Sequence, residues 1–383
     1  MHIPDGYLSP QTCAAGLLVA VPMLGVAATK VHDRVKTRNV PTLAVLAAVC
    51  FLIMMFNVPI PDGTTAHAVG GALVAILLGP WAAVIAVSVA LAFQALLFGD
   101  GGVLAFGVNV VNMAIVLPFV AYGVYRLIAG RAALTSGRRV VAAFIGGYVG
   151  LNTAALCCGI ELGIQPDLFQ DAHGAPLYSP YHLSQAVPAM LLAHLVVAGV
   201  AEGIITGAVV AYLQRANLPL LRVNHPDVPV TTEEAAQDAA RRQWLRPTVV
   251  AGAVMALLVV LTPLGLLAPG GAFGENPPED LDLHKLGLST IPEGLNKYNG
   301  FWHDAIFSGY DFTGDSHPTL GYLVSAVTGI LVVGLVVLLI GKLVARLATP
   351  DDPTTDGPTT DDPGEPTPGE GATTPETTKK IRS

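Results

Sequence analysis

The chain is poor in charged residues, and the few that it has form no strongly basic surface. Charged side chains make up 13% of the 383 residues, whereas apolar side chains make up 52%, and the mean hydropathy is +0.58. Much of the formal charge of −8 comes from the tail after Thr349. We therefore expect no nucleic-acid partner. The composition predicts a protein of the lipid bilayer, because runs of about 20 apolar residues cross a membrane as helices.

Basic residues are also missing from the amino terminus, where the first is Lys30. A secretory signal peptide begins with a basic region and ends at a cleavage site of small residues. Nothing in this stretch indicates such a peptide. We therefore expect Met1 to be retained, with a free α-amine.

The sequence lacks the motifs of disulfide or thiolate chemistry and of ATP hydrolysis. The four cysteines (Cys13, Cys50, Cys157 and Cys158) lie in apolar stretches and form neither a C-x-x-C pair nor a disulfide framework. A phosphate-binding loop of the form G-x-x-x-x-G-K-[ST] is absent, since the Gly-Lys pair at 341–342 is followed by leucine. We expect small apolar packing from the cysteines and no ATP hydrolysis by this chain.

Nine apolar segments follow one another along the chain. They predict an all-α, polytopic helical membrane protein, in which a bundle of seven segments is joined by two additional transmembrane helices. The segments are 11–29, 40–58, 66–79, 81–98, 103–127, 140–163, 184–213, 248–268 and 319–344.

The connections rich in Lys and Arg all fall on one side of this arrangement. They are 30–39, 126–139, 215–246 and the region from Lys342 onward. Basic connections face the cytoplasm, so we expect the amino terminus outside and the carboxyl terminus inside. Only Lys285 and Lys297 then remain outside, which leaves 18 of the 20 basic residues in the cytoplasm.

Segment 66–79 is shorter than a bilayer is thick, and glycine-containing turn signals lie on both sides of it. Broken segments of this kind often build substrate sites. It can equally be a short helix whose ends are covered by neighbours. His67 lies at its outer end, on the side predicted for Met1.

The first residues, Met-His-Ile-Pro-Asp-Gly, contain a possible chelate. The α-amine of Met1, the amide of His2 and the His2 imidazole can bind one ion through a five- and a six-membered ring. A nitrogen of His67 would complete a plane of four. Tetragonal nitrogen ligation suits Ni(II) and Cu(II) and is accepted by Co(II), whereas structural zinc prefers a tetrahedron with thiolates. Because the amide must lose a proton and the amine must be neutral, affinity should fall as the pH drops.

Five motifs in one order carry a resemblance to a known family. They are MHIPDGYLSP, DGTTAHAVGGALVAILLGPWAAV, LLFGDGG, NVVNMAIVLPF and AHLVVAGVAEGIITG. Over residues 1–215 the chain resembles the substrate-capture component of cobalt/nickel energy-coupling-factor transporters, the CbiM/NikM family. The resemblance implies capture of Ni²⁺ or Co²⁺ from outside by the amino terminus with His2, joined by His67.

The same resemblance implies partners and a location. Members of this family carry no ATPase of their own, so uptake depends on a transmembrane coupling (T) subunit and on ATPase subunits from other chains. The protein is expected to be a multi-pass component of the prokaryotic cell membrane. It should bind and orient the ion, which is its transported substrate, and it needs no cofactor.

Other polar residues inside the apolar segments need an explanation, because burying them there is costly. Asn109 and Asn112 lie three residues apart, on one helix face, and could support the loop around the metal or form hydrogen bonds between helices. His194 and Glu202 also share a face. An interhelical hydrogen bond is the preferred role for them, and metal ligation is the alternative.

The last third of the chain is predicted to be a second unit. The predicted domains are a metal-capture domain at 1–214, a cytoplasmic linker at 215–247, a two-span unit at 248–346 and a disordered cytoplasmic tail at 347–383. The two-span unit, with its outside loop at 269–318, resembles the PDGLE auxiliary component, which implies help in loading metal. Its signature run departs from the family, since Pro-Glu-Gly-Leu-Asn stands at 292–296.

Two functions therefore remain in view. The preferred one is the metal-capturing component of an ATP-driven importer, and the alternative is a membrane metalloenzyme that uses His67, His194 and Glu202. Nickel and cobalt both fit, with a slight preference for nickel from the planar geometry. The outside loop could also collect metal loosely through His284, His303, Asp304, Asp315 and His317, although exposed polar residues without such a role are the simpler reading.

Overall fold

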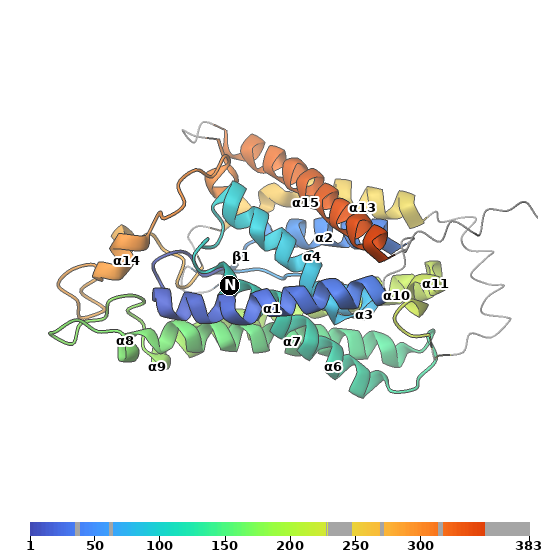
Figure 1. The fold of residues 1–383 in the computed structure, drawn as a ribbon, viewed down its shortest axis with the longest axis horizontal. Helices are drawn as coiled ribbons and strands as arrows, with labels where there is room; N and C mark the ends of the chain where they lie inside the picture. The colour runs from blue at the N-terminus through green and yellow to red at the C-terminus, as the bar shows by residue number, and fades with distance from the viewer. Residues whose placement is uncertain are drawn as a thin grey trace, which may run out of the picture. The chain divides into compact units, whose positions relative to one another are not determined.

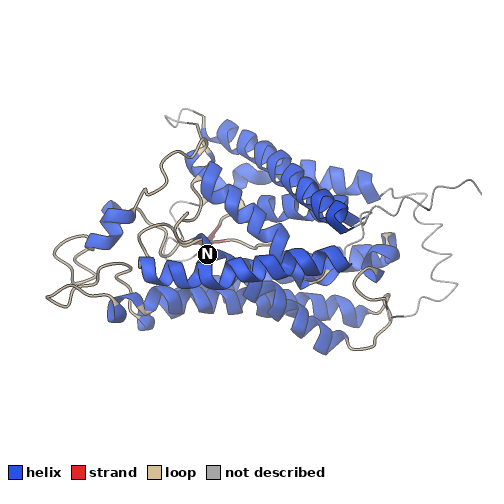
Figure 2. Ribbon diagram, in the orientation of Figure 1, coloured by secondary structure: helices blue, strands red, loops and turns tan. Residues whose placement is uncertain are grey.

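The computed structural model of the protein describes residues 1–34, 39–60, 64–226, 228, 247–268, 272–312 and 317–348. All of them belong to one compact unit, Met1–Ala348. Most of the predicted linker at 215–247, all but the first two residues of the predicted tail, and Asp315 of the outside loop lie outside these ranges. Helices make up most of the described chain, and strands are few (Figures 1 and 2).

The helices follow the apolar segments of the sequence. In the first half they are α1 (Pro10–Arg34), α2 (Val40–Met54), α3 (Gly71–Leu78), α4 (Pro80–Phe93), the π-helix η2 (Gln94–Phe98), α5 (Phe106–Asn109), the π-helix η3 (Val110–Val116) and α6 (Leu117–Ala129). Next come α7 (Gly137–Gly163), α8 (Gln165–Leu168), α9 (Leu183–Ala193), the π-helix η4 (His194–Ala198), α10 (Gly199–Ala216) and α11 (Leu218–Arg222). The last are α13 (Pro247–Leu261), the 3₁₀ helices η5 (Thr262–Leu267), η6 (Pro278–Asp280) and η7 (Ser308–Tyr310), α14 (Glu293–Tyr298) and α15 (Pro318–Ala348).

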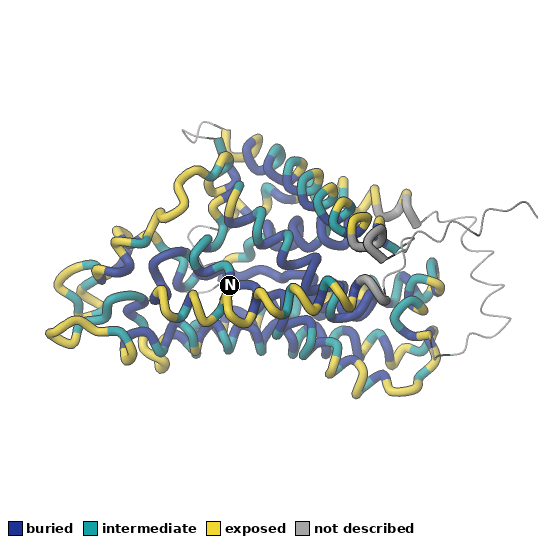
Figure 3. The backbone as a smooth tube through the Cα atoms, viewed as in Figure 1, coloured by how far each residue is buried: buried dark blue, intermediate teal, exposed yellow. Residues whose placement is uncertain are grey.

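Six of these helical stretches are long and apolar enough to cross a membrane. They are Pro10–Val31, Pro80–Phe98, Phe106–Ala129, Gly137–Leu168, Leu183–Ala216 and Pro318–Leu343. Two shorter apolar helices, Val40–Met54 and Gly252–Leu267, accompany them. Large apolar side chains on their outer faces are exposed, among them Leu18 and Leu127 (Figure 3). An apolar surface of this kind is suited to lipid, and the predicted class of a polytopic helical membrane protein is confirmed.

The short segment at 66–79 has an unusual structure. Its first residue, Ala66, ends a two-stranded antiparallel sheet of β1 (Val58–Ile60) and β2 (Thr64–Ala66). Only α3 is helical, and all eight of its residues are buried. Gly70 and Gly79 bound this helix with φ of +80° and +96°, a region that favours glycine. The segment therefore passes through the middle of the bundle as strand, loop and short helix.

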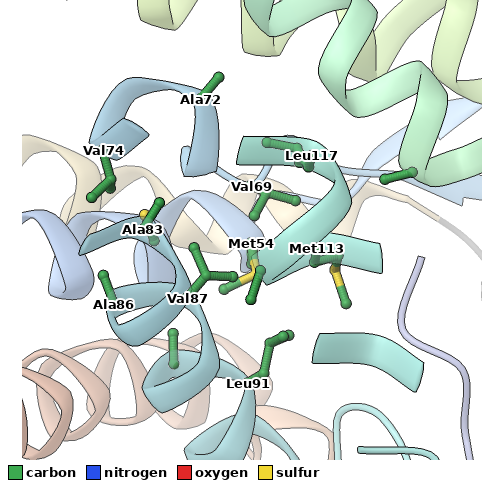
Figure 4. Close-up of a cluster of buried hydrophobic side chains, with 14 of the residues drawn as sticks. Met54, Val69, Ala72, Val74, Ala83, Ala86, Val87, Leu91, Met113 and Leu117 are labelled. Carbon is green, nitrogen blue, oxygen red and sulfur yellow. The ribbon is translucent and has the colours of Figure 1, made fainter. Parts of the chain in front are cut away.

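The main apolar core lies around α3 and α4. Met54 from α2, Val87 from α4 and Met113 from η3 are buried together there, as Figure 4 shows. On the other side of α3, helices α6, α7 and α10 pack closely through small residues. A Cβ on Gly203 of α10 would lie only 2.8 Å from the carbonyl oxygen of Phe144 of α7, so a larger residue would push these helices apart.

The C-terminal helices join the bundle along α2. Helix α15 packs against α2, and a Cβ on Gly329 of α15 would overlap the ring of Phe51. Between α13 and α15, the described residues 272–312 form an extended connection (Figure 1, orange). Its backbone bonds to earlier parts of the chain, with Leu295 donating to the Leu177 carbonyl at 3.1 Å and Phe307 to the Leu97 carbonyl at 2.9 Å.

Candidate metal site

The amino-terminal residues are enclosed in the bundle, where the label N stands in Figure 1. Met1, His2 and Ile3 are 2%, 3% and 1% exposed. The Asp5 carboxylate holds the turn that follows by accepting the backbone N–H groups of residues 103, 104 and 105 at 3.1, 2.8 and 3.3 Å. Burial raises the pKa of Asp5 above its usual value, although these three hydrogen bonds counteract the rise. The turn is thereby fixed to the start of α5.

Asn109 fixes the residue next to the candidate chelate. Its side-chain oxygen accepts the Ile3 N–H at 2.9 Å, and its side-chain amide donates to the Ile3 carbonyl at 3.0 Å. The same carbonyl accepts the N–H of Gly102 at 2.9 Å. Ile3 is therefore bound through both backbone groups, and this fixes the position from which His2 and Met1 extend.

The imidazoles of His2 and His67 lie against each other. His2 Nδ1 and His67 Nε2 are 3.2 Å apart, and the ring centroids are 4.8 Å apart. His67 Nδ1 lies 2.9 Å from the Ala68 carbonyl and donates to it, so Nε2 is left with a free lone pair. The six-membered chelate ring of an amide and an imidazole closes through Nδ1 of His2. The structure therefore directs the required nitrogen of His2 toward the free nitrogen of His67.

This separation is suited to a shared ion. Imidazole nitrogens bind metals at about 2.0–2.1 Å, which puts two adjacent ligands on one ion about 2.9 Å apart. The observed 3.2 Å is within a small side-chain movement of that value. The distance between these two imidazole nitrogens is therefore close to the value expected for two ligands of one ion.

Polar residues that the sequence analysis did not assign surround His2. Asp100 Oδ1 lies 3.2 Å from His2 Nδ1, and Gln94 Oε1 lies 3.3 Å from His2 Nε2. The hydroxyl of Tyr310 donates to Asp100 and accepts from Gln94 Nε2. Of Gln94, Asp100 and Tyr310, only Asp100 belongs to one of the motifs noted in the sequence, LLFGDGG.

The amine of Met1 also has an unpredicted partner. It lies 3.0 Å from Glu275 Oε1, a residue 274 positions away in the chain. Burial lowers the pKa of this amine, but the nearby carboxylate of Glu275 raises it, and the net direction is upward. The chelating end of the chain is therefore held by an ion pair.

The two asparagines have different partners. Asn109 bonds to Ile3 as described, whereas the Asn112 side chain donates to Glu161 Oε2 at 2.6 Å. Asn109 therefore contacts the amino-terminal turn, whereas Asn112 joins η3 to α7.

The residues of the alternative enzyme site make other contacts. Glu202 accepts the backbone N–H groups of Val69, Gly70 and Ala72 at 2.8, 2.8 and 3.2 Å, and so caps α3. His194 Nδ1 donates to the Met190 carbonyl at 2.7 Å.

Among the residues that the structure describes, no group of three or more His, Cys, Asp and Glu side chains is placed to hold a metal ion. His284, His303 and His317, which the sequence analysis assigns to an outside loop, are exposed. The predicted four-nitrogen site is not a group of this kind, because two of its nitrogens are the amine of Met1 and the amide of His2.

A bundle of apolar helices encloses the nitrogen atoms of the amino terminus, and the relatives of this chain are named as transport proteins, so the chain is placed among membrane transport proteins. The comparisons with known proteins identify the family. The family model described as "Cobalt uptake substrate-specific transmembrane region" (CbiM) matches residues 2–220, and the PDGLE domain matches residues 246–346. The chain belongs to the CbiM family and carries a PDGLE domain.

Relatives with the same two-part organisation cover most of the chain. The fused nickel transport protein NikMN of Rhodobacter capsulatus is 46% identical, over 86% of this chain and 94% of its own length. The probable fused nickel transport protein LarMN of Lactiplantibacillus plantarum is 44% identical, over 87% and 95%. A crystal structure titled as a transition metal transporter is 55% identical, covers 59% of this chain and 99% of its own, and superposes with a TM-score of 0.54.

Proposed function

We propose that this protein is the substrate-binding membrane component of an ATP-driven nickel importer. Its four ligands would be the Met1 amine, the His2 amide nitrogen, His2 Nδ1 and His67 Nε2. The observation that supports this proposal is that His2 Nδ1 and His67 Nε2 lie 3.2 Å apart inside an enclosed site. In this account the chain captures the ion and catalyses no reaction.

Energy for uptake would come from other chains. The sequence has no phosphate-binding loop of the G-x-x-x-x-G-K-[ST] form, and its motifs resemble those of energy-coupling-factor transporters. We therefore propose a transmembrane coupling subunit and ATPase subunits as partners. The distribution of basic residues favours an outside amino terminus and an inside carboxyl terminus, so that the capture site lies at the outer end of the bundle.

Nickel is preferred to cobalt for two reasons. A plane of four nitrogens that includes a deprotonated amide is a ligand set that Ni(II) favours. In addition, two relatives that cover more than four-fifths of this chain are named as nickel transport proteins. Cobalt remains the second substrate to test, because the family description names it.

The proposal also divides the chain into working parts. Residues 1–214 would capture the metal, and residues 248–346 would assist loading from the outer side. The contacts between segment 272–312 and the amino-terminal region support a role of this segment in loading.

A short uncleaved extension ahead of Met1 tests this function. It removes the terminal amine and leaves every side chain in place. We expect the purified protein with a native terminus to bind Ni²⁺ more tightly than Co²⁺, and the extended protein to lose binding of both. Equal nickel affinity of the two proteins would contradict the proposal and move the site to other residues.

A further inference from the structure

A short segment of the PDGLE domain makes two contacts with the amino-terminal residues and one with Tyr181. The ring of Phe273 packs on Tyr181, with centroids 4.5 Å apart. The hydroxyl of Tyr7 donates to the Asn276 carbonyl at 2.8 Å. Between these two contacts, Glu275 bonds to the amine of Met1 at 3.0 Å. The position of the carboxylate is therefore fixed on both sides of the residue that bears it.

We propose that Glu275 is a positioning residue for metal capture, which holds the Met1 amine in the orientation needed for chelation. This inference rests on the proposed function. All of the expected ligands belong to the CbiM region. The inference adds one side chain of the PDGLE domain to the residues that build the site.

The hydrogen count of the amine supports this role. An amine bound to a metal through its lone pair keeps two N–H groups. One of them can still donate to Glu275, so the contact survives capture of the ion. The carboxylate thus fixes the rotation of the amine, so that the lone pair of the amine nitrogen is directed away from Glu275. Partners of this kind, which orient a ligand without touching the ion, commonly affect metal affinity by 10- to 100-fold.

The charge of the site after it has bound the metal ion also favours this role for Glu275. A divalent ion with one deprotonated amide carries a net charge of about +1 into an enclosed site, where the ion's own charge dominates the electrostatics. The side chain of Glu275 is 24% exposed and that of Met1 is 0% exposed, so Met1 is the more enclosed of the two residues in this ion pair. A fixed carboxylate at this end compensates the charge that the ion brings.

A second contact from the same domain reaches His2. Tyr310 donates to Asp100, and Asp100 lies 3.2 Å from His2 Nδ1. Both of the first two residues are thus connected to the PDGLE domain, Met1 directly and His2 through Asp100. The connection to Met1 is the simpler one to test because it involves a single side chain.

The test uses the full-length protein and Ni²⁺ as the probe. Glu275→Gln keeps the shape and one acceptor oxygen but removes the charge, and Glu275→Asp keeps the charge on a shorter stem. Glu279→Gln is the matched control, because Glu279 is exposed and four residues away. Because Glu275 also raises the pKa of the amine, the variants are compared at alkaline pH, where protons compete little with the metal in any of them. There we expect nickel affinity to fall about 10- to 100-fold in Glu275→Gln, to recover partly in Glu275→Asp, and to stay unchanged in the control.

Two further readouts separate positioning from a general structural effect. The unfolding temperature without metal should be similar in Glu275→Gln and the control, and the visible absorption of the bound nickel should change only in the former. Wild-type affinity and absorption in Glu275→Gln, while the amino-terminal extension still abolishes binding, would overturn this inference and leave the proposed function intact. Binding that survives the extension would instead overturn the proposed function.

Discussion

Replacing Asp5 by alanine should weaken nickel binding strongly, although Asp5 is not a ligand in our proposal. Its carboxylate accepts three backbone N–H groups at the start of α5, at distances from 2.8 to 3.3 Å. These bonds fix the turn that directs residues 1 and 2 into the bundle. Without them, the chelating end must be ordered at the moment of metal binding.

The size of the effect follows from the three donors. A buried donor that loses its partner costs about 1–3 kcal/mol. Of the three, only the N–H of Ala105 belongs to a fully buried residue, whereas Val103 and Leu104 are partly accessible and can bond to water. We therefore expect a total of about 3 kcal/mol, which corresponds to roughly 100-fold in the dissociation constant.

The assay is calorimetric titration of the detergent-solubilised protein with Ni²⁺. Asp280→Ala is the control, because Asp280 is an exposed acidic residue of the PDGLE domain. Asp5→Asn should give an intermediate loss, since one carbonyl oxygen remains to accept a bond. A nickel affinity of Asp5→Ala within twofold of the control would refute the reasoning that this anchor pre-orders the site.

Three other predictions concern the ligands and their surroundings. His67→Ala should lower nickel affinity by at least 10-fold and shift the visible absorption of the bound ion, and an unchanged spectrum would exclude His67 as a ligand. Nickel affinity should rise with pH from 6 to beyond 8 in competition titrations. The pKa of the Met1 amine is raised, so protons still compete with nickel above the ordinary value of 8.0. A pH-independent affinity would contradict ligation by the amine. Glu202→Gln should lower stability by about 2 kcal/mol in thermal unfolding, since it weakens the cap on α3, and an unchanged unfolding temperature would show that this cap contributes little.

Hydropathy alone was sufficient to predict the membrane class and the order of the helices. Each of the nine apolar segments contains a helix in the structure, and the glycines at 70 and 79 explain why the third is so short. The chain gave less information about the residues before α3, because a strand of three residues inside a bundle has no hydropathy signal of its own.

Asn109 and Asn112 lie three residues apart, a spacing that predicts one helix face. The helix is irregular between them, because the π-helix η3 begins at Val110. Asn109 bonds to Ile3, whereas Asn112 bonds to Glu161 on α7. The spacing of the two residues could not distinguish these partners.

The contacts across the candidate site could not be predicted from local patterns. The amine of Met1 bonds to a residue 274 positions away, and Asp100 to one 210 positions away. Such pairs depend on how segment 272–312 packs over the bundle. By contrast, the choice of Met1, His2 and His67 came from the chemistry of nitrogen ligands and from motif order, which are properties of the sequence itself.

Nickel should be bound in a plane by four nitrogens, two of which are the amine of Met1 and the backbone amide of His2. X-ray absorption spectroscopy of the nickel-loaded, full-length protein measures the ligands and their geometry. We expect four nitrogen ligands at about 1.9–2.1 Å in square-planar geometry, with no sulfur. Six oxygen and nitrogen ligands in an octahedron, or any sulfur ligand, would contradict it.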